Sequence, residues 1–313
     1  MAEHAMYFAD DKARKIYLTK KILGKVACYL FLSIFALFIV APFVMMVVGS
    51  FINYESFHEF AKTADFKWLG FSGGNWGFKN YKHIFDMSDK NLQFPTYFLN
   101  TFIVAIGSTT VTVVTAVLAA FAFARLEFKG KEPLFALLLA TMMIPGEMMV
   151  ITNYMTVDVL HWRNTFAALI LVHGVSVFYV FYLRQTFQQI PNELYLAAKV
   201  DGVSDMGYLL KVMVPIAMPT ITTIIILSMM GSWNSYVWPN LVAREGWALN
   251  ENHTMKLVSN GLRDAFALTD SGATNMEAVK IAGSMVISTP LFIVFILFRK
   301  YIMRGVSRSG IKG

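Results

Sequence analysis

The sequence predicts an all-α membrane protein with six transmembrane helices. Of its 313 residues, 56% are hydrophobic and only 15% are charged, whereas about a quarter of the residues of a soluble domain are charged. Six separate stretches reach the length of about 20 mainly apolar residues that a helix needs to cross a bilayer. The alternating ten-residue segments typical of an outer-membrane barrel are absent from the sequence. We therefore expect a single helical bundle in the cytoplasmic (inner) membrane.

The six stretches are separated by polar segments or by segments that contain proline. They are Lys25–Phe51, Asn100–Phe123, Pro133–Val157, Thr165–Tyr182, Val214–Trp238 and Ile281–Ile302. The first is too long for the apolar region of a signal peptide and is followed by no small-x-small cleavage site, so we expect it to remain as a helix. In the third, Pro145-Gly146 predicts a kink, which serves either a pathway or helix packing.

Lysine and arginine indicate which side of the membrane each loop occupies, because cationic loops are retained in the cytoplasm. Most of the 27 basic residues lie before the first stretch, after the second, after the fourth and after the sixth. Both termini are therefore expected in the cytoplasm, with residues 1–24 as a basic arm and residues 25–313 as one transmembrane domain. The net charge of +7 suits anionic lipid headgroups and requires no nucleic acid partner.

Catalytic and nucleotide-binding motifs are missing from the sequence. It contains no G-x-x-x-x-G-K-[ST] phosphate loop, and its six histidines show no metal-ligand spacing such as H-E-x-x-H. Its one cysteine, Cys28, cannot build a disulfide framework or a metal cluster by itself. We therefore expect no enzymatic activity, no metal and no cofactor in this chain.

Residues 191–219, between the fourth and fifth stretches, are too polar to span a membrane but carry apolar residues at helical spacing. Asn192 can cap a short helix, and Gly202 permits the sharp turn that ends it. Ser204 or Asp205 can begin a second short helix. The segment predicts a helix-turn-helix on the cytoplasmic surface, with a plain amphipathic surface helix as the alternative.

At these residues the sequence resembles the permease subunits of binding-protein-dependent ABC importers, specifically the carbohydrate branch that includes the smaller maltose permease subunit. The family pattern there is approximately P-x-E-x-x-E-A-A-x-x-D-G, followed by L-P-x-x-x-P. The matching positions are Pro191, Glu193, Ala197, Ala198, Asp201, Gly202, Pro215 and Pro219. Further family traits are Asn100-Thr101, Ile144-Pro145-Gly146 and Gly231-Ser232-Trp233-Asn234. The resemblance covers nearly the whole range from residue 25 to residue 313.

The resemblance implies a type I ABC importer permease domain over residues 25–313, in which residues 191–215, the coupling loop, dock on an ATPase subunit. It also implies a second similar permease, two ATPase subunits that carry ATP and Mg²⁺, and an extracytoplasmic solute-binding protein. The chain would supply half of a pathway that imports a sugar or oligosaccharide by alternating access. The alternatives are an ABC permease for a non-sugar solute and a proton-coupled secondary transporter that uses Glu147.

The chain departs from the family pattern at one position of the coupling loop. The glutamate that usually precedes the Ala-Ala pair is Leu196 here, and Glu193 is a separate acid three residues earlier. We therefore expect docking to depend more on apolar contact. Glu193 and Asp201 are the two candidates for the role of the missing glutamate.

Two groups of residues are candidates for lining a solute pathway. Glu147 places a costly charge in the third stretch, so it either faces a wet pathway or takes part in structural hydrogen bonds. Trp233, Asn234 and Tyr236 suit a sugar, because ring faces stack on sugars and amides bond to hydroxyls. Helix packing is the alternative role for Trp233 and Asn234.

Overall fold

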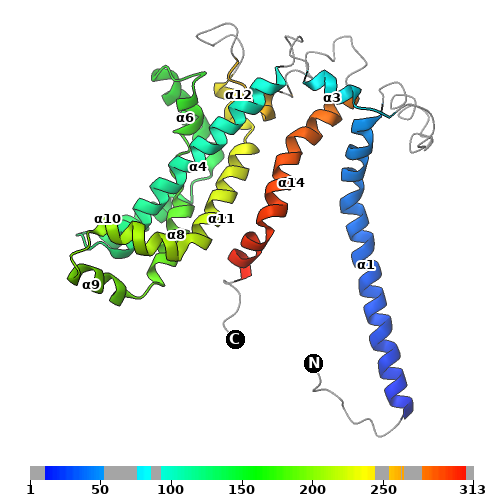
Figure 1. Ribbon diagram of the computed structural model, residues 1–313, viewed down its shortest axis with the longest axis horizontal. Helices are drawn as coiled ribbons and strands as arrows, with labels where there is room; N and C mark the ends of the chain where they lie inside the picture. The colour runs from blue at the N-terminus through cyan, green and yellow to red at the C-terminus, as the bar shows by residue number, and fades with distance from the viewer. Residues whose placement is uncertain are drawn as a thin grey trace. The chain divides into compact units, whose positions relative to one another are not determined.

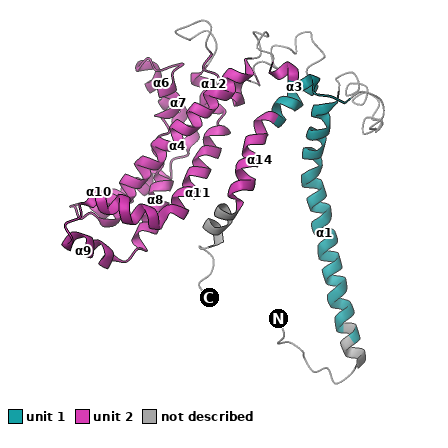
Figure 2. Cartoon of the chain, in the orientation of Figure 1, with its two compact units in different colours: residues 1–81, 277–285 teal, residues 82–276, 286–313 magenta. Residues whose placement is uncertain are grey.

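The computed structural model describes residues 11–52, 76–85, 93–243, 254–261, 263 and 277–307. These residues are mostly helical, which confirms the predicted all-α class (Figure 1). Within these described residues, four helices are long and apolar enough to cross a membrane, namely Tyr17–Phe51, Phe94–Arg125, Asp205–Trp233 and Ala278–Arg299. The chain divides into two compact units (Figure 2). The first unit comprises residues 1–81 and 277–285, and the second comprises residues 82–276 and 286–313.

Helix α1 (Asp11–Phe51) forms most of the described part of the first unit. At 1.5 Å per residue its 41 residues span about 61 Å, which is about twice the hydrocarbon thickness of a bilayer. The basic N-terminal turns of α1 therefore extend beyond the length that the hydrocarbon requires. The boundary predicted at residue 24 falls inside this helix, and residues 1–10 lie outside the described residues, so the domain assignment stays a prediction.

A buried asparagine holds the C-terminal end of α1 to the start of α3 (Lys79–Ile84). The Asn80 amide donates to the carbonyl of Ser50 at 2.9 Å and to that of Ile52 at 3.0 Å. The Tyr81 hydroxyl donates to the Ser50 hydroxyl at 2.7 Å. Because carbonyls at a helix C-terminus lack intrahelical donors, these bonds supply the partners that the end of α1 needs.

Helix α4 (Phe94–Arg125) is the central element of the second unit and packs against both α8 (Val177–Gln188) and α11 (Val214–Trp233). Its buried face includes small residues such as Ala116 and Ala120. Small side chains let helix backbones approach closely, which is how helices associate in a membrane. α4 therefore holds the other helices of this unit together.

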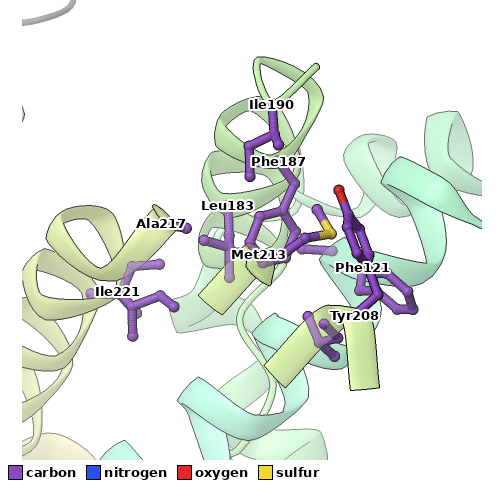
Figure 3. Close-up of a cluster of buried hydrophobic side chains, with 11 residues drawn as sticks. Phe121, Leu183, Phe187, Ile190, Tyr208, Met213, Ala217 and Ile221 are labelled. Carbon is purple, nitrogen blue, oxygen red and sulfur yellow. The ribbon is translucent and has the colours of Figure 1, made fainter. Parts of the chain in front are cut away.

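A buried apolar cluster joins α4 and α8 to α10 (Asp205–Tyr208), the short π-helix η3 (Leu209–Met213) and α11. We call it the loop-anchoring core, and it consists of Ala120, Phe121, Leu183, Phe187, Ile190, Tyr208, Leu209, Met213, Ala217, Ile221 and Ile224. Figure 3 shows side chains from these helices converging around Met213. The core lies at the end of the second unit that carries α9 and α10, which we call the loop end (Figure 1).

The predicted kink at Pro145-Gly146 is confirmed, and it is a complete break. Helix α5 (Lys131–Thr141) and helix α6 (Met149–Val159) are bent by 79° about a 3₁₀ turn, η2 (Gly146–Met148). Pro145 has no N–H to donate to the preceding turn, and its ψ of 131° is extended. The third predicted stretch is therefore either a broken span or a re-entrant loop.

The prediction of one helix over Thr165–Tyr182 is wrong. The structure has a short helix α7 (Phe166–Ile170), and α8 begins only at Val177. Ser176 caps α8 by accepting a bond from the Tyr179 amide at 3.4 Å, and a Cβ on Gly174 would lie 2.6 Å from the Val111 side chain of α4. Capping and close approach to α4 thus interrupt a stretch whose composition alone suggests a span. Six crossings stay a prediction, because the described helices provide four, or five with the bent pair.

Replacing Phe187 by Ala is expected to destabilise the second unit by about 3 to 5 kcal/mol, because it opens a cavity in a packed core. Phe187 is 0% exposed, whereas Phe178 on the same helix is 49% exposed and serves as the matched control. Thermal unfolding of both purified Ala variants in detergent measures the difference. Similar losses for both would contradict the position of the core.

Candidate coupling loop and solute cavity

In residues 192–208 the structure has a helix, a turn and the start of a second helix, but the second helix is not the short one predicted, because it continues through η3 and α11 to Trp233. Helix α9 (Asn192–Val200) is followed by a turn in which Gly202 has a φ of +71°, a conformation that glycine adopts without strain. Ser204 then caps α10, because its hydroxyl accepts a bond from the Gly207 amide at 3.2 Å. The predicted cap at Asn192 is wrong, since Pro191 occupies the capping position and Asn192 is already the first helical residue.

A polar contact joins α9 to the start of α10 across the turn. The Tyr195 hydroxyl donates to Asp205 Oδ1 at 2.7 Å, and Lys199 Nζ lies 2.6 Å from the same oxygen. The hydrogen bond to Asp205 raises the pKa of Lys199 above its ordinary value of 10.5. The charged Lys199 therefore stabilises the loop fully below pH 10.5. This stabilisation is lost only as the pH rises through the raised pKa of Lys199. Burial, and then the bond to Asp205, raise the pKa of Tyr195 as well.

The predicted docking residues occupy two sides of α9. Glu193, Leu196, Ala197 and Val200 are exposed at helical spacing, and the side chain of Leu196 is 56% exposed. Asp201, Gly202 and Pro215 are exposed too, whereas Ala198 is half-buried against the loop-anchoring core. The exposed face of α9 therefore presents an apolar side chain at the position where the family pattern has glutamate. Docking on an ATPase stays a prediction.

A cavity of about 240 Å³ lies inside the second unit, between α4, the start of α8, α11 and α12 (Val237–Val242). Its polar lining consists mainly of hydroxyl groups, from Ser108, Thr112, Ser176, Tyr179, Ser228, Ser232 and Ser235. His173 also lines the cavity, with its ring edge-on to that of Trp238. No Asp, Glu, Lys or Arg is among these described lining residues. The cavity therefore suits a neutral ligand that carries hydroxyl groups.

Trp233 lies beside the cavity residues but does not line the cavity. Its indole is 3% exposed and donates to the carbonyl of Ile287 at 3.1 Å. Its ring also makes edge contacts with Phe98 and Phe102 of α4. These are the contacts of helix packing, the alternative that the sequence left open. A role in a solute pathway stays a prediction for Trp233.

The other predicted pathway residues also lie outside the cavity lining. Asn234 is exposed and donates to the carbonyl of Met230 at 2.9 Å, at the end of α11. Tyr236 is half-buried, and the Arg263 guanidinium lies 5.0 Å from the centre of its ring. Glu147 is exposed in η2 and makes no ion pair or hydrogen bond within the described residues. A pathway role for each of the three stays a prediction.

Sequence reasoning missed the serines of α11 and its end. Ser228, Ser232 and Ser235 recur at intervals of four and three residues, which places them on one side of the chain as it leaves the helix. This spacing could have identified the cavity wall. The prediction instead named the aromatic and amide residues beside these serines, because ring faces stack on sugars and amides bond to their hydroxyls.

A short segment, residues 254–261, contributes Leu257 to the cavity lining. The Asn100 amide donates to the carbonyls of Thr254 at 2.8 Å and Lys256 at 3.1 Å, and the Thr101 hydroxyl accepts a bond from the Val258 amide at 2.9 Å. Leu257, between these anchors, lines the cavity. The Asn100-Thr101 pair that contributed to the resemblance thus fixes one wall of the cavity.

Comparison with known proteins identifies the family. Residues 112–309 match the family described as the binding-protein-dependent transport system inner membrane component. The chain belongs to this family. The matched range includes the coupling loop, the loop-anchoring core and most of the cavity lining. The predicted resemblance to permease subunits of binding-protein-dependent importers is therefore confirmed.

Individual relatives and solved structures agree with the family. The permease is 32% identical, over 70% of its length and 74% of the relative's, to the arabinooligosaccharides transport system permease protein AraQ of Halalkalibacterium halodurans. Its fold matches a bacterial ABC transporter involved in the import of the acidic polysaccharide alginate, with a TM-score of 0.72, 21% identity and coverage of 90% and 97% of the two chains. A second match is a bacterial alginate ABC transporter in complex with an alginate pentasaccharide-bound periplasmic protein. It has a TM-score of 0.56 and 15% identity, over 93% of the permease and 97% of the matched chain.

Replacing Gly261 by Ala in this permease is expected to destabilise the segment 254–261, because the new Cβ would lie 2.6 Å from the Tyr97 ring. Overpacking of this kind typically costs about 1 to 3 kcal/mol. The control is Gly231→Ala, where nothing lies within 4 Å of the added Cβ. Thermal unfolding in detergent compares the two, and an equally stable Gly261→Ala variant would contradict the packing.

Replacing Lys199 by Gln is expected to speed cleavage of the coupling loop by chymotrypsin about two- to fivefold at neutral pH. The expected effect is small because an ion pair between exposed side chains contributes little to stability. The loss arises because Asp205 keeps only its bond from Tyr195. The control is Lys211→Gln, because Lys211 is exposed and makes no ion pair within the described residues. Equal cleavage of both variants would show that the contact does not order the loop.

Proposed function

We propose that this permease is one membrane-spanning subunit of an ATP-driven importer that moves a sugar or oligosaccharide across the cytoplasmic membrane by alternating access. The observation that carries the proposal is the continuity between the coupling loop and the cavity. The loop follows α8, whose first residues line the cavity, and leads through η3 into α11, whose last residues line it too. A force applied to the loop therefore acts on two walls of the cavity.

The chemistry of the cavity supports a sugar as the solute. Serine and threonine hydroxyls both donate and accept hydrogen bonds, which matches the hydroxyl groups of a saccharide. The name of the relative, an arabinooligosaccharides transport system permease protein, supports this choice. Asn234, Tyr236 and Glu147 would then line parts of the pathway that a second subunit completes. Exposure of Glu147 at the break between α5 and α6 fits such a position, because a charge facing lipid is costly.

Partner subunits would supply the energy and the solute. The sequence has no phosphate loop, so ATP and Mg²⁺ would bind two separate ATPase subunits, one of which meets the coupling loop. A second similar permease would complete the pathway, and a solute-binding protein would deliver the sugar on the outer side. The periplasmic protein bound to the similar alginate transporter supports this last partner. Both termini would lie in the cytoplasm, beside anionic lipid headgroups.

The experiment that tests the proposed function is sugar uptake into proteoliposomes that contain the permease with its partner permease and ATPase subunits. Uptake of labelled oligosaccharide is expected to require ATP inside and the solute-binding protein outside. Proteoliposomes with the permease alone are the control and should take up nothing. Uptake by the permease alone down a proton gradient would instead establish a secondary transporter.

Replacing Gly202 by Pro is expected to abolish co-purification with the ATPase subunit. Proline fixes φ near −65°, which is incompatible with the φ of +71° at this turn, and it removes the amide that donates to the Lys199 carbonyl. Gly202→Asn is the matched control, because asparagine tolerates the left-handed conformation and keeps the amide. Unchanged co-purification of the proline variant would refute the docking role of the loop.

A further inference from the structure

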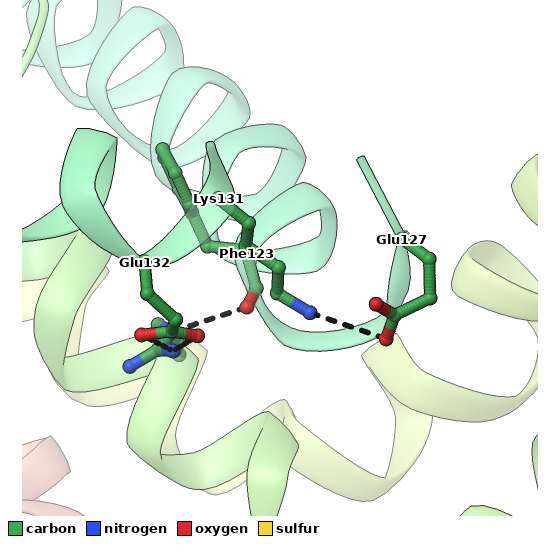
Figure 4. A network of polar contacts seen from close by, with 5 residues as sticks. Phe123, Glu127, Lys131 and Glu132 are labelled. Atoms are coloured by element: carbon green, nitrogen blue, oxygen red, sulfur yellow. Dashed lines mark hydrogen bonds and ion pairs between the residues drawn. The ribbon is translucent and has the colours of Figure 1, made fainter. Parts of the chain in front are cut away.

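Two arginines at the loop end connect α4, α5 and α8 through their side chains. Arg184 of α8 is buried, and its Nε donates to the Phe123 carbonyl in the last turn of α4 at 3.1 Å. Its Nη2 donates to both carboxylate oxygens of Glu132 in the first turn of α5, at 2.8 Å and 3.2 Å. Figure 4 shows Glu132 and the Phe123 carbonyl approaching the same group. The guanidinium also lies 4.0 Å from the centre of the Phe135 ring.

The second arginine, Arg125, belongs to α4 and bonds to the end of α8. Arg125, in the last turn of α4, donates from Nη2 to the Phe187 carbonyl at 2.9 Å and also to the Ile190 carbonyl. Carbonyls at the C-terminus of a helix lack intrahelical donors and carry partial negative charge. Arg184 thus caps the end of α4, and Arg125 caps the end of α8. Ile190 immediately precedes Pro191, so the second cap lies directly at the entrance to the coupling loop.

These hydrogen bonds prevent α4 and α8 from sliding along one another, which the apolar loop-anchoring core does not. Apolar contact is non-directional, so the core can hold α4 and α8 together while still allowing them to slide along one another. Hydrogen bonds from a planar guanidinium have a fixed geometry, and each arginine bonds two acceptors at once. Sliding would leave the buried Arg184 guanidinium without its partners, which is costly. The two arginines therefore fix the relative positions of the helix ends.

We propose that Arg125 and Arg184 are positioning residues that transmit movement of the coupling loop to the solute cavity. The proposal rests on the proposed function. Because the two arginines join them, the ends of α4, α5 and α8 move as one rigid body when the loop moves. Helix α4 carries this movement to the cavity, because Thr112 lines the cavity and lies about 20 Å along the helix from Arg125. Without the arginines the loop still docks, but its displacement is lost as sliding between helices.

The experiment measures ATP hydrolysed per oligosaccharide transported, in proteoliposomes of the complete importer with its solute-binding protein. Arg184→Met is expected to raise this ratio about fivefold, as for other residues that carry coupling between sites. Arg184→Lys should give an intermediate ratio, because an ammonium keeps the charge but lacks the planar fork. Arg125→Gln provides an independent second variant if Arg184→Met does not assemble.

The matched control is Arg163→Met. Arg163 also pairs with an acid, Asp158, and lies against an aromatic ring, that of Tyr154, but it is between α6 and α7, away from the coupling loop (Figure 1). Its replacement is expected to leave the ratio unchanged. A merely structural role for Arg184 would lower hydrolysis and transport in parallel, and the unchanged ratio would overturn the inference. A rise as large in Arg163→Met would overturn it too. If the wild-type importer shows no ATP-dependent uptake, the proposed function itself fails and the inference fails with it.

Discussion

The packing of the coupling loop into the core between α4, α8 and α11 is the interaction on which the second unit depends. Helix α9 has nine residues, and a helix this short is not stable in water by itself. It persists because Tyr195 and Ala198 pack against the loop-anchoring core and because Tyr195 and Lys199 both bind Asp205 at the start of the next helix. The loop is therefore a rigid extension of the helices that it connects.

Breaks in the helices make room for the cavity. The interruption before α8 leaves irregular backbone inside the unit, and such backbone is tolerated within a membrane protein only where other groups satisfy it. Thr115 of α4 does so by donating to the Gly174 carbonyl at 2.8 Å. The same interruption places Ser176 and His173 on the cavity wall. One local departure from helical structure thus serves both packing and the candidate site.

Features that depend on local chemistry were predictable. The turn at Gly202 and the break at Pro145 follow from the conformations that glycine and proline allow, and the second helix of the loop begins at one of the two expected caps. The error at residues 165–182 has a physical origin. That stretch is apolar enough to span, but Gly174 lies against Val111 of α4, and an apolar composition carries no information about which neighbour approaches a residue.

The sequence by itself determined that this protein is an all-helical membrane protein with a folded polar loop, because hydropathy, charge placement and turn residues act locally. It also carried the family pattern. Only the tertiary structure decided that serines rather than Trp233 line the cavity, and that Arg125 and Arg184 cap each other's helices. Those features depend on how each helix is rotated about its axis and on contacts between distant residues. Arg125 and Ile190, 65 positions apart, meet only once α4 and α8 have packed together.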